Sequence, residues 1–279
     1  MTNSRLSSAL TLALGFAALA CGGGKSDQTS GTVSPGYIPP GGGNGGSSSA
    51  LQSDGTLLLK GVIRDFKANY PDMEPCTNSG KSCDSGHNEQ HPGCVGSNEC
   101  IVGTILDSQS KPQYVGPASG TLTTTGPANF ANWFNKSTYS MPQDLPLTLI
   151  PDGNGAFTYR NLEFFPIDGQ LFGNEGKDAN GVSHNFNFTT EFHLKFTYQS
   201  GQTFTFRGDD DLWVFVDGNL QIDLGGIHAG QEATLQLDTL GLAPGTDHDF
   251  AIFYCERHVV ASELEIQTSI QFSRSITVN

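Results

Sequence analysis

The sequence predicts an all-β protein, an antiparallel β-sandwich or β-barrel. Short apolar runs rich in β-branched and aromatic residues recur along the chain, and Gly/Pro-rich turns separate them. Several runs alternate with period two, which is typical of half-buried strands. The 35 glycines, the aromatic content of 10% and the charged content of only 15% favour a turn-rich β protein over a helical one.

The first 20 residues have the pattern of an export signal. Arg5 supplies the positive charge, and residues 9–20 form a short apolar stretch that ends in small side chains. Residues 18–21, ALAC, resemble a bacterial lipobox, so we expect cleavage before Cys21 and attachment of lipid to that cysteine. Ordinary secretion with cleavage nearby is the alternative.

The next segment, residues 21–53, is rich in Gly, Ser and Pro and has no periodicity. Such a composition cannot bury a core, so we expect a flexible tether that carries one β-rich domain over residues 54–279. The chain has 14 Lys and Arg against 28 Asp and Glu, a formal net charge of −14. That balance argues against nucleic-acid binding and suits an exported protein, anchored by lipid to the outer membrane or cell surface of a bacterium.

Residues 57–66, LLLKGVIRDF, carry apolar side chains on both faces, which predicts a strand that is covered on both sides. Aromatic residues 130–134, FANWF, are consistent with a helical turn. Further strands are expected in this half at residues 101–106, 145–150 and 157–165.

Four cysteines cluster in a polar, Gly/Pro-rich segment: Cys76, Cys83, Cys94 and Cys100. In an exported protein such a group predicts two disulfides that staple a loop with little core of its own, although the sequence leaves the pairing open. Zinc binding together with His87 and His91 is the alternative, but no C-x-x-C pair occurs and an oxidising compartment disfavours thiolates. Cys255 lies in an apolar strand and is expected to be a single core thiol.

Residues 189–198, TTEFHLKFTY, alternate cleanly between apolar and polar positions. We expect the apolar positions to face the core and Glu191, His193 and Lys195 to face solvent, which explains these residues better than a metal site does. The other strands expected in this half are residues 202–207, 212–216, 220–224, 233–237, 249–255 and 264–272.

The most informative stretch is residues 207–226, RGDDDLWVFVDGNLQIDLGG. Its apolar run, residues 212–216, predicts a buried strand, and we expect Trp213 to belong to the core and not to stack on a ligand. Asp217-Gly218 predicts a hairpin turn, because both residues tolerate positive φ.

Asp209, Asp210 and Asp211 stand directly before that strand. Three adjacent carboxylates repel one another, and a hard cation held by their oxygens, with calcium as the best fit, would remove that repulsion. A solvated acidic turn is the alternative.

The chain resembles the fibro-slime domain family, a branch of the protective-antigen-type, lectin-like β-barrel superfamily. The resemblance implies a β-barrel of that type, in which the cysteine-rich residues 76–100 look like a loop insertion. The matching stretches occur in the family's order: IRDF at 63–66, FFPIDG at 164–169, HNFNFTTEFHLKF at 184–196, GDDDLWVFVDG at 208–218, DLGGIH at 223–228 and ERH at 256–258.

This resemblance also implies a calcium site. In the superfamily two consecutive aspartates that open a strand bind calcium, and adhesins of the flocculin type use the ion to bind sugar hydroxyls. Asp209 and Asp210 occupy those positions, so they are the implied primary ligands, with Asp211 and Glu256 as secondary ligands. The superfamily usually has Gly where Asp211 stands.

The loop after residues 249–255 is the implied ligand-binding loop, and it contributes Arg257 and His258. The chain lacks the Asn that the adhesins have in this loop, which affects the expectation of sugar binding more than that of metal binding.

We expect no catalysis, because no nucleophile elbow, zincin motif or P-loop occurs. Asp209 and Asp211 meet the spacing of about 5–10 Å that glycosidases need, but a calcium-bound aspartate stays ionised and is a poor general acid. The expected function is calcium-assisted recognition of an extracellular glycan or matrix protein, as in adhesion. A structural matrix component whose calcium only rigidifies a loop is the first alternative, and a polysaccharide hydrolase is the second.

Overall fold

The computed structural model describes residues 49–73, 101–121, 123–259 and 261–276, all within the unit Gly31–Asn279. Among these residues no helix is long and apolar enough to cross a membrane. The expected signal, the lipidation site and most of the tether lie outside the described residues, as do the four clustered cysteines. Lipidation and the two disulfides therefore stay predictions for Cys21, Cys76, Cys83, Cys94 and Cys100.

The described chain is built almost entirely of β-strands. They are β1 (Leu57–Phe66), β2 (Ser140–Pro151), β3 (Phe157–Asn161), β4 (Gly176–Lys177), β5 (Ser183–His184), β6 (Phe188–Thr197), β7 (Thr203–Gly208), β8 (Asp211–Val216), β9 (Asn219–Leu224), β10 (Gln231–Gln236), β11 (Asp247–Glu256), β12 (Leu264–Thr268) and β13 (Phe272–Ser275). One α-helical turn, α2 (Pro127–Phe130), and one 3₁₀ turn, η1 (Leu237–Leu240), complete the described elements.

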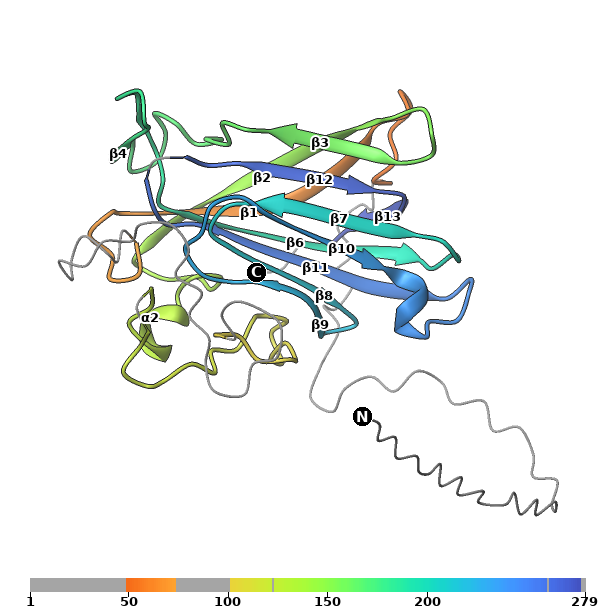
Figure 1. Cartoon of the computed structure of the whole chain (residues 1–279), viewed down its shortest axis with the longest axis horizontal. Helices are drawn as coiled ribbons and strands as arrows, with labels where there is room; N and C mark the ends of the chain where they lie inside the picture. Colours follow the sequence, from red (N-terminus) through yellow and green to blue (C-terminus); the bar gives the residue numbers. More distant parts are fainter. Residues whose placement is uncertain (1–48, 74–100, 122, 260, 277–279) are drawn as a thin grey trace, which may run out of the picture. The chain divides into compact units, whose positions relative to one another are not determined.

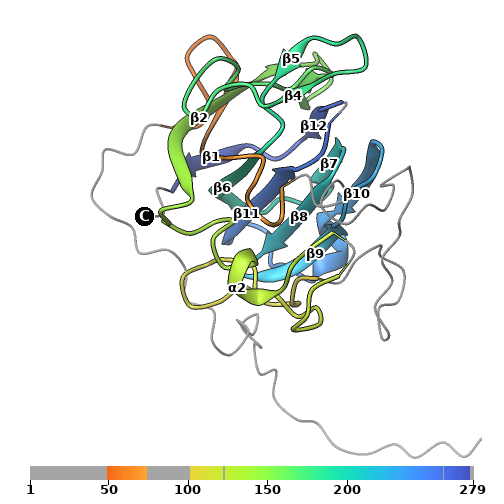
Figure 2. The ribbon, with the colours of Figure 1, turned by 90° about the vertical axis from the view of Figure 1, so that its left-hand side faces the viewer.

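One antiparallel sheet of 11 strands forms the body of the domain, in the order β10-β7-β12-β3-β2-β1-β6-β11-β8-β9, with β13 also paired to β6. Its two outermost strands, β9 and β10, contact each other, so the sheet curls into a nearly closed barrel (Figures 1 and 2). The prediction of an all-β, antiparallel barrel is confirmed. The hairpin between β8 and β9 is confirmed as well, because Asp217 and Gly218 have φ of 48° and 74°, as its turn requires.

The barrel interior is an aromatic core. Alternate residues of β6, β7 and β11 point inward and bury their side chains against one another, among them Phe192, Phe196, Phe204, Phe206 and Phe250. Each fully buried side chain of this size contributes about 1.5–3 kcal/mol through removal of apolar surface from water. The two-sided burial predicted for β1 is present only at its end: Ile63 belongs to this interior core and Phe66 to a second core outside the barrel, whereas Leu58 and Val62 on the outer face are half-buried.

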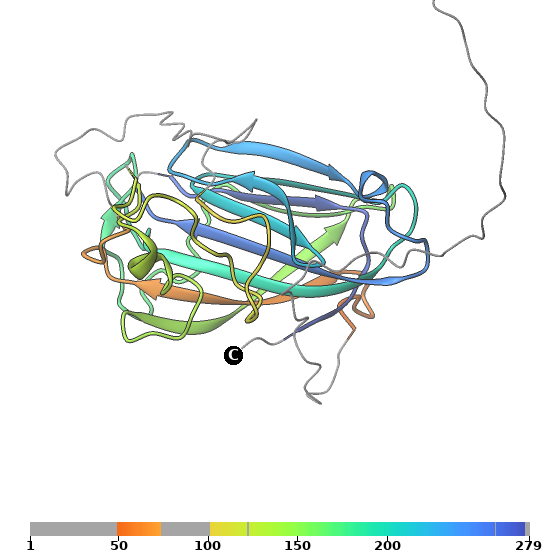
Figure 3. The ribbon, with the colours of Figure 1, turned by 90° about the horizontal axis from the view of Figure 1, so that it is seen from below.

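That second core lies between the outer face of β8 and β11 and a stretch that we call the cover segment, residues 67–73, 101–121 and 123–139. Figure 3 shows its loops and α2 in front of these strands, and Figure 1 shows them beneath the same strands. Trp133 and Phe134 of the cover segment pack with Trp213 and Phe253 of the sheet. Trp213 is buried as predicted, and so is Cys255, a free thiol.

The cover segment makes one expectation for β6 wrong. Glu191 and His193 do not face solvent, because this face of the strand lies beneath the cover segment and both residues are buried. Glu191 pairs with two buried cations: Arg64 Nη2 lies 2.7 Å from Oε1 and Lys111 Nζ lies 2.5 Å from Oε2. Lys195 alone stays partly exposed and pairs with Asp249 at 2.6 Å.

The surroundings of Glu191 keep it ionised. Burial by itself would raise the pKa of this carboxyl group, but the hydrogen bond and charge of His193, together with Arg64 and Lys111, lower that pKa to about 2. The cover segment is therefore held to the sheet by a charged contact as well as by apolar packing.

Three further expectations about local elements are corrected. Residues 101–106 do not form a ladder strand; they make only the isolated bridges Val102 to Tyr114 and Ile105 to Asn219. Their neighbours are short loops and a strand edge, so no continuous partner strand lies beside them. The helical turn expected at residues 130–134 comes earlier, in α2, and β3 ends at Asn161 and not at residue 165.

We predict that Glu191→Gln lowers the free energy of unfolding by about 3–5 kcal/mol, because it leaves two cations buried without a counter-charge. Urea denaturation of the purified protein measures the change. The matched control is Glu265→Gln, which breaks an exposed pair with Arg160 and should cost no more than about 1 kcal/mol. Equal losses in the two variants would contradict the assigned burial of the Glu191 cluster.

Candidate functional site

Four carboxyl groups meet at one end of the barrel. Asp209 and Asp210 form the link between β7 and β8, Asp211 opens β8, and Glu256 closes β11. The ladder between the two strands pairs Cys255 with Asp211, so Glu256 lies next to the aspartate triplet. The exposed fractions of the four residues, in sequence order, are 6%, 4%, 0% and 0%. The structure thus brings together all four residues that the sequence suggested as metal ligands, and it buries them.

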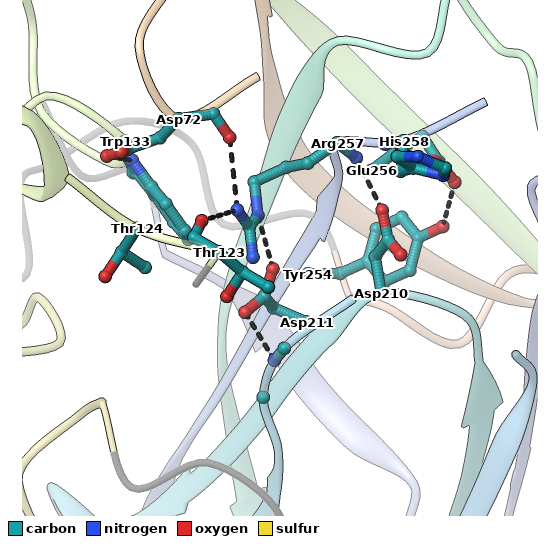
Figure 4. Close-up of polar contacts among 12 residues, drawn as sticks. Asp72, Thr123, Thr124, Trp133, Asp210, Asp211, Tyr254, Glu256, Arg257 and His258 are labelled. Atoms are coloured by element: carbon teal, nitrogen blue, oxygen red, sulfur yellow. Dashed lines mark hydrogen bonds and ion pairs between the residues drawn. The ribbon is translucent and has the colours of Figure 1, made fainter. Parts of the chain in front are cut away.

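Asp211 has its own cation. Its Oδ2 accepts a hydrogen bond from Arg257 Nε at 2.6 Å, and both side chains are fully buried (Figure 4). Its Oδ1 accepts the backbone N–H of Gly226 at 2.7 Å. Both oxygens of Asp211 therefore already have hydrogen-bond partners within the protein.

Arg257 is held on several sides by the cover segment. Its Nη1 donates to the backbone carbonyls of Thr123, at 2.6 Å, and Asp72, at 3.1 Å (Figure 4). Its guanidinium carbon lies 4.5 Å from the centre of the Trp133 ring, a cation–π contact. Although burial by itself lowers the pKa of this guanidinium, the neighbouring Asp211 carboxylate raises it above its usual value. The sequence suggested Arg257 as a ligand-binding residue, and the structure places it inside the protein.

Asp210 adopts an unusual backbone conformation. Its φ is 53°, in the left-handed region that few residues other than Gly adopt, and its side chain is directed at the start of the loop after β11. There Oδ2 accepts the backbone N–H of Arg257 at 2.8 Å, while the Asp210 N–H donates to the carbonyl of His228 at 3.3 Å. Strained backbone of this kind is concentrated at functional sites.

The hydroxyl of Tyr254 lies between the remaining carboxylates. It is 3.2 Å from Glu256 Oε2, 3.4 Å from Asp209 Oδ1 and 3.3 Å from Ser262 Oγ. Ser262 donates its own proton to the carbonyl of Phe164. A tyrosine hydroxyl has one proton, and an ionised carboxylate only accepts, so Tyr254 can satisfy one of the two carboxylates but not both.

Burial and mutual repulsion raise the pKa values of the carboxyl groups of Asp209, Asp210 and Glu256. Burial raises the pKa of Asp209 to about 6. Burial, followed by the charge of Asp209, raises the pKa of Asp210 well above its usual range, and burial followed by the charges of Asp210 and Asp209 does the same for Glu256. Among the ion pairs of the described residues, none joins a basic side chain to Asp209, Asp210 or Glu256.

The donor chemistry of this cluster fits a hard divalent cation. Three carboxylates at one end of the barrel offer oxygen ligands and up to three negative charges, which is the kind of set that calcium prefers. As they stand, no three His, Cys, Asp or Glu side chains of the described residues converge closely enough to hold a metal ion. Binding therefore requires Asp209, Asp210 and Glu256 to turn toward a common point.

The sequence missed several residues that shape this site. The backbone N–H of His258 donates to Glu256 Oε1 at 3.3 Å. The first residues of the suggested ligand-binding loop therefore orient the carboxyl groups through their backbone. Nothing in the sequence marked Asp72, Thr123 or Trp133 as neighbours, because they reach Arg257 across more than 120 residues. Tyr254 was within reach of sequence reasoning, since it lies two residues before Glu256 and so on the same strand face.

Comparison with known proteins supports a domain class. The family model of the PA14 domain matches residues 166–279, which include β6 to β13 and all four carboxyl groups. The prediction of a protective-antigen-type fold is thereby confirmed.

The chain is similar to proteins of Dictyostelium discoideum. It is 36% identical to protein psiR over 232 residues and 36% identical to protein psiQ over 234 residues. The matches cover 79% and 80% of this chain, and it spans about a fifth of the length of each relative, 22% in both cases. Among solved structures, a PA14 sugar-binding domain from an RTX adhesin is similar with 14% identity and a TM-score of 0.26, over 43% of this chain and 78% of that one.

We predict that the free energy of unfolding, measured in a chelator, falls as the pH rises from about 4 to 6. Asp209 has a pKa of about 6 in the folded state and 3.8 as its ordinary value, so over this range the unfolded state releases its proton first and is favoured. One such group contributes at most about 1.4 kcal/mol per pH unit.

The variant Asp209→Asn isolates this contribution, because Asp65, whose pKa burial also raises to about 6, is present in both proteins. Thermal melts at half-unit pH steps should show a shallower decline for the variant. If Tm falls with pH equally in wild type and variant, burial does not raise the pKa of Asp209.

Proposed function

We propose that this domain recognises carbohydrate without catalysing a reaction, through a calcium ion held by Asp209, Asp210 and Glu256. The observation that carries the proposal is the charge imbalance at the barrel end. Three buried carboxyl groups lie beside one another, while Arg257, the one cation that the described residues place in contact with the cluster, pairs with Asp211. A divalent cation would balance two of the three charges and let all three groups stay ionised at neutral pH.

The domain class supports the carbohydrate part of the proposal. PA14 domains are carbohydrate-binding and adhesion modules, and proteins that contain them are typically found outside the cell or on its surface. Bound calcium keeps coordination positions that sugar hydroxyls fill as neutral oxygen ligands. Export and a lipid anchor at Cys21 would place such a module at a surface, where a glycan or matrix protein is the partner.

The burial of the cluster argues against hydrolysis. A glycosidase presents two carboxyl groups on opposite sides of a scissile bond, so both must reach substrate. Asp211 and Glu256 are inaccessible to solvent, and Asp211 is neutralised by Arg257. Burial raises the pKa values of Asp209, Asp210 and Glu256, the neighbouring carboxylates add to this effect for Asp210 and Glu256, and a bound calcium ion would lower all three.

A purely structural calcium site is the second candidate, and the low exposure of the carboxyl groups favours it. With at most 6% of any of these residues exposed, an ion bound among them would touch solvent only after local movement. In that case the domain would be a matrix component whose calcium fixes the link between β7 and β8.

We predict saturable calcium binding to the purified protein, with loss of binding in the double variant Asp209→Ala/Asp210→Ala. Isothermal titration measures the affinity, and calcium at 100 times Kd should stabilise the fold by about 2.7 kcal/mol. The matched control is Asp178→Ala, which removes a half-buried carboxylate from the turn between β4 and β5, outside the link between β7 and β8. If millimolar calcium gives neither heat nor a rise in Tm, the cation site does not exist.

We also predict that a glycan array gives a signal with the wild-type protein in calcium and none in a chelator. Asp210→Ala should abolish the signal, whereas Asp178→Ala should keep it. Calcium binding without any glycan signal would favour the structural role. Glycan binding that survives both the chelator and Asp210→Ala would exclude a calcium-bridged mechanism.

A further inference from the structure

Arg257 connects the carboxylate cluster to the cover segment. Its side chain pairs with Asp211, its backbone N–H donates to Asp210 Oδ2, and its Nη1 donates to the carbonyls of Asp72 and Thr123. The cover segment and the start of β8 are therefore both bonded to the same fully buried residue.

The two ends of this residue cannot move independently. The guanidinium is fixed by an ion pair, two carbonyl acceptors and the face of Trp133, so a shift of the cover segment shifts the side chain. Because Arg257 is fully buried, its rotatable side-chain bonds have little room to absorb a displacement of the guanidinium, which is passed on to the N–H that orients Asp210. Asp209 makes no hydrogen bond or ion pair with Arg257; its Oδ1 accepts the N–H of Glu263 at 2.7 Å.

The cover segment is anchored to Arg257 by its own polar contacts. The side chain of Asp72 accepts hydrogen bonds from Trp133 Nε1, at 2.9 Å, and from the backbone N–H of Thr125, at 2.6 Å. These contacts hold the Trp133 ring against the guanidinium and bring the Asp72 carbonyl within reach of Nη1. A second, separate anchor of the same segment is Lys111 on Glu191, which does not involve Arg257.

We propose that Arg257 is a positioning residue that couples docking of residues 123–133, a part of the cover segment in contact with it, to cation binding at Asp209, Asp210 and Glu256. The inference rests on the proposed function for the identity of the cation, but the coupling itself is a property of the protein. Coupling between two sites is reciprocal, so the cation stabilises the docked cover segment as much as docking strengthens cation binding.

The first test needs no calcium. In a chelator, hydrogen exchange of the backbone amides of residues 123–133 is compared between wild type, Asp210→Ala and Asp209→Ala. Asp210→Ala removes the acceptor of the Arg257 N–H and should speed this exchange about fivefold or more, whereas Asp209→Ala, its neighbour of identical chemistry, should leave the exchange unchanged. Equal behaviour of the two variants would overturn the coupling.

The second test measures calcium affinity in two variants of the cover segment that touch none of the four clustered carboxyl groups. Trp133→Phe removes the hydrogen bond to Asp72 and alters the surface beneath the guanidinium, so it should weaken calcium binding about fivefold or more. Lys111→Met loosens the other anchor and should lower Tm while leaving the calcium affinity within about twofold.

Each combination of results has a distinct meaning. Trp133→Phe with a lower Tm and unchanged calcium affinity would reduce Arg257 to a purely structural residue and overturn the proposal. A wild-type protein that does not bind calcium but shows the expected exchange difference would overturn the proposed function and the coupling to cation binding, and would leave only the link between Asp210 and the cover segment.

Discussion

The ion pair between Asp211 and Arg257 is the contact on which the arrangement of the site depends. Both residues are completely buried, so loss of either partner would leave an uncompensated charge in the protein, at a cost of about 3–5 kcal/mol. The pair fixes the start of β8 against the end of β11 and ties both to the cover segment. It also engages the guanidinium in contact with the cluster, and in the described part of the chain no basic side chain forms an ion pair with Asp209, Asp210 or Glu256.

Period-two alternation made most of the fold predictable, because an antiparallel strand with one buried face has apolar and polar residues at alternate positions. β1, β6 and β11 were found within about two residues of their ends. Residues 101–106 were misassigned for a physical reason: they are apolar because they lie in the second core, not because they join a ladder. An apolar run indicates that a segment is buried. A loop that packs against a core has the same apolar composition as a strand buried in a sheet.

The candidate site was predictable in part. Adjacency in sequence identified the aspartate triplet, and resemblance to a family added Glu256. The partners that decide which aspartate is neutralised come from the cover segment, and neither spacing nor composition connects Trp133 with Arg257. The same limit explains Glu191, whose alternating pattern predicts a solvated face unless the overlying residues are known. Long-range contacts between a strand face and an irregular segment leave no local signal.

The two buried charged clusters differ in a way that bears on the cation. Glu191 is one carboxylate with two cations, Arg64 and Lys111, whereas for the four carboxyl groups at the barrel end the described residues supply Arg257 alone. The surroundings of Glu191 thus supply two cations for one carboxylate, whereas Asp65 and Asp72, which are buried too, rely within the described residues on hydrogen bonds alone. A shortage at the barrel end then calls for a charge from outside the chain. A bound divalent ion would supply that charge. Protonation of the carboxyl groups is the other way to remove the repulsion, but the protons would be lost as the pH rises.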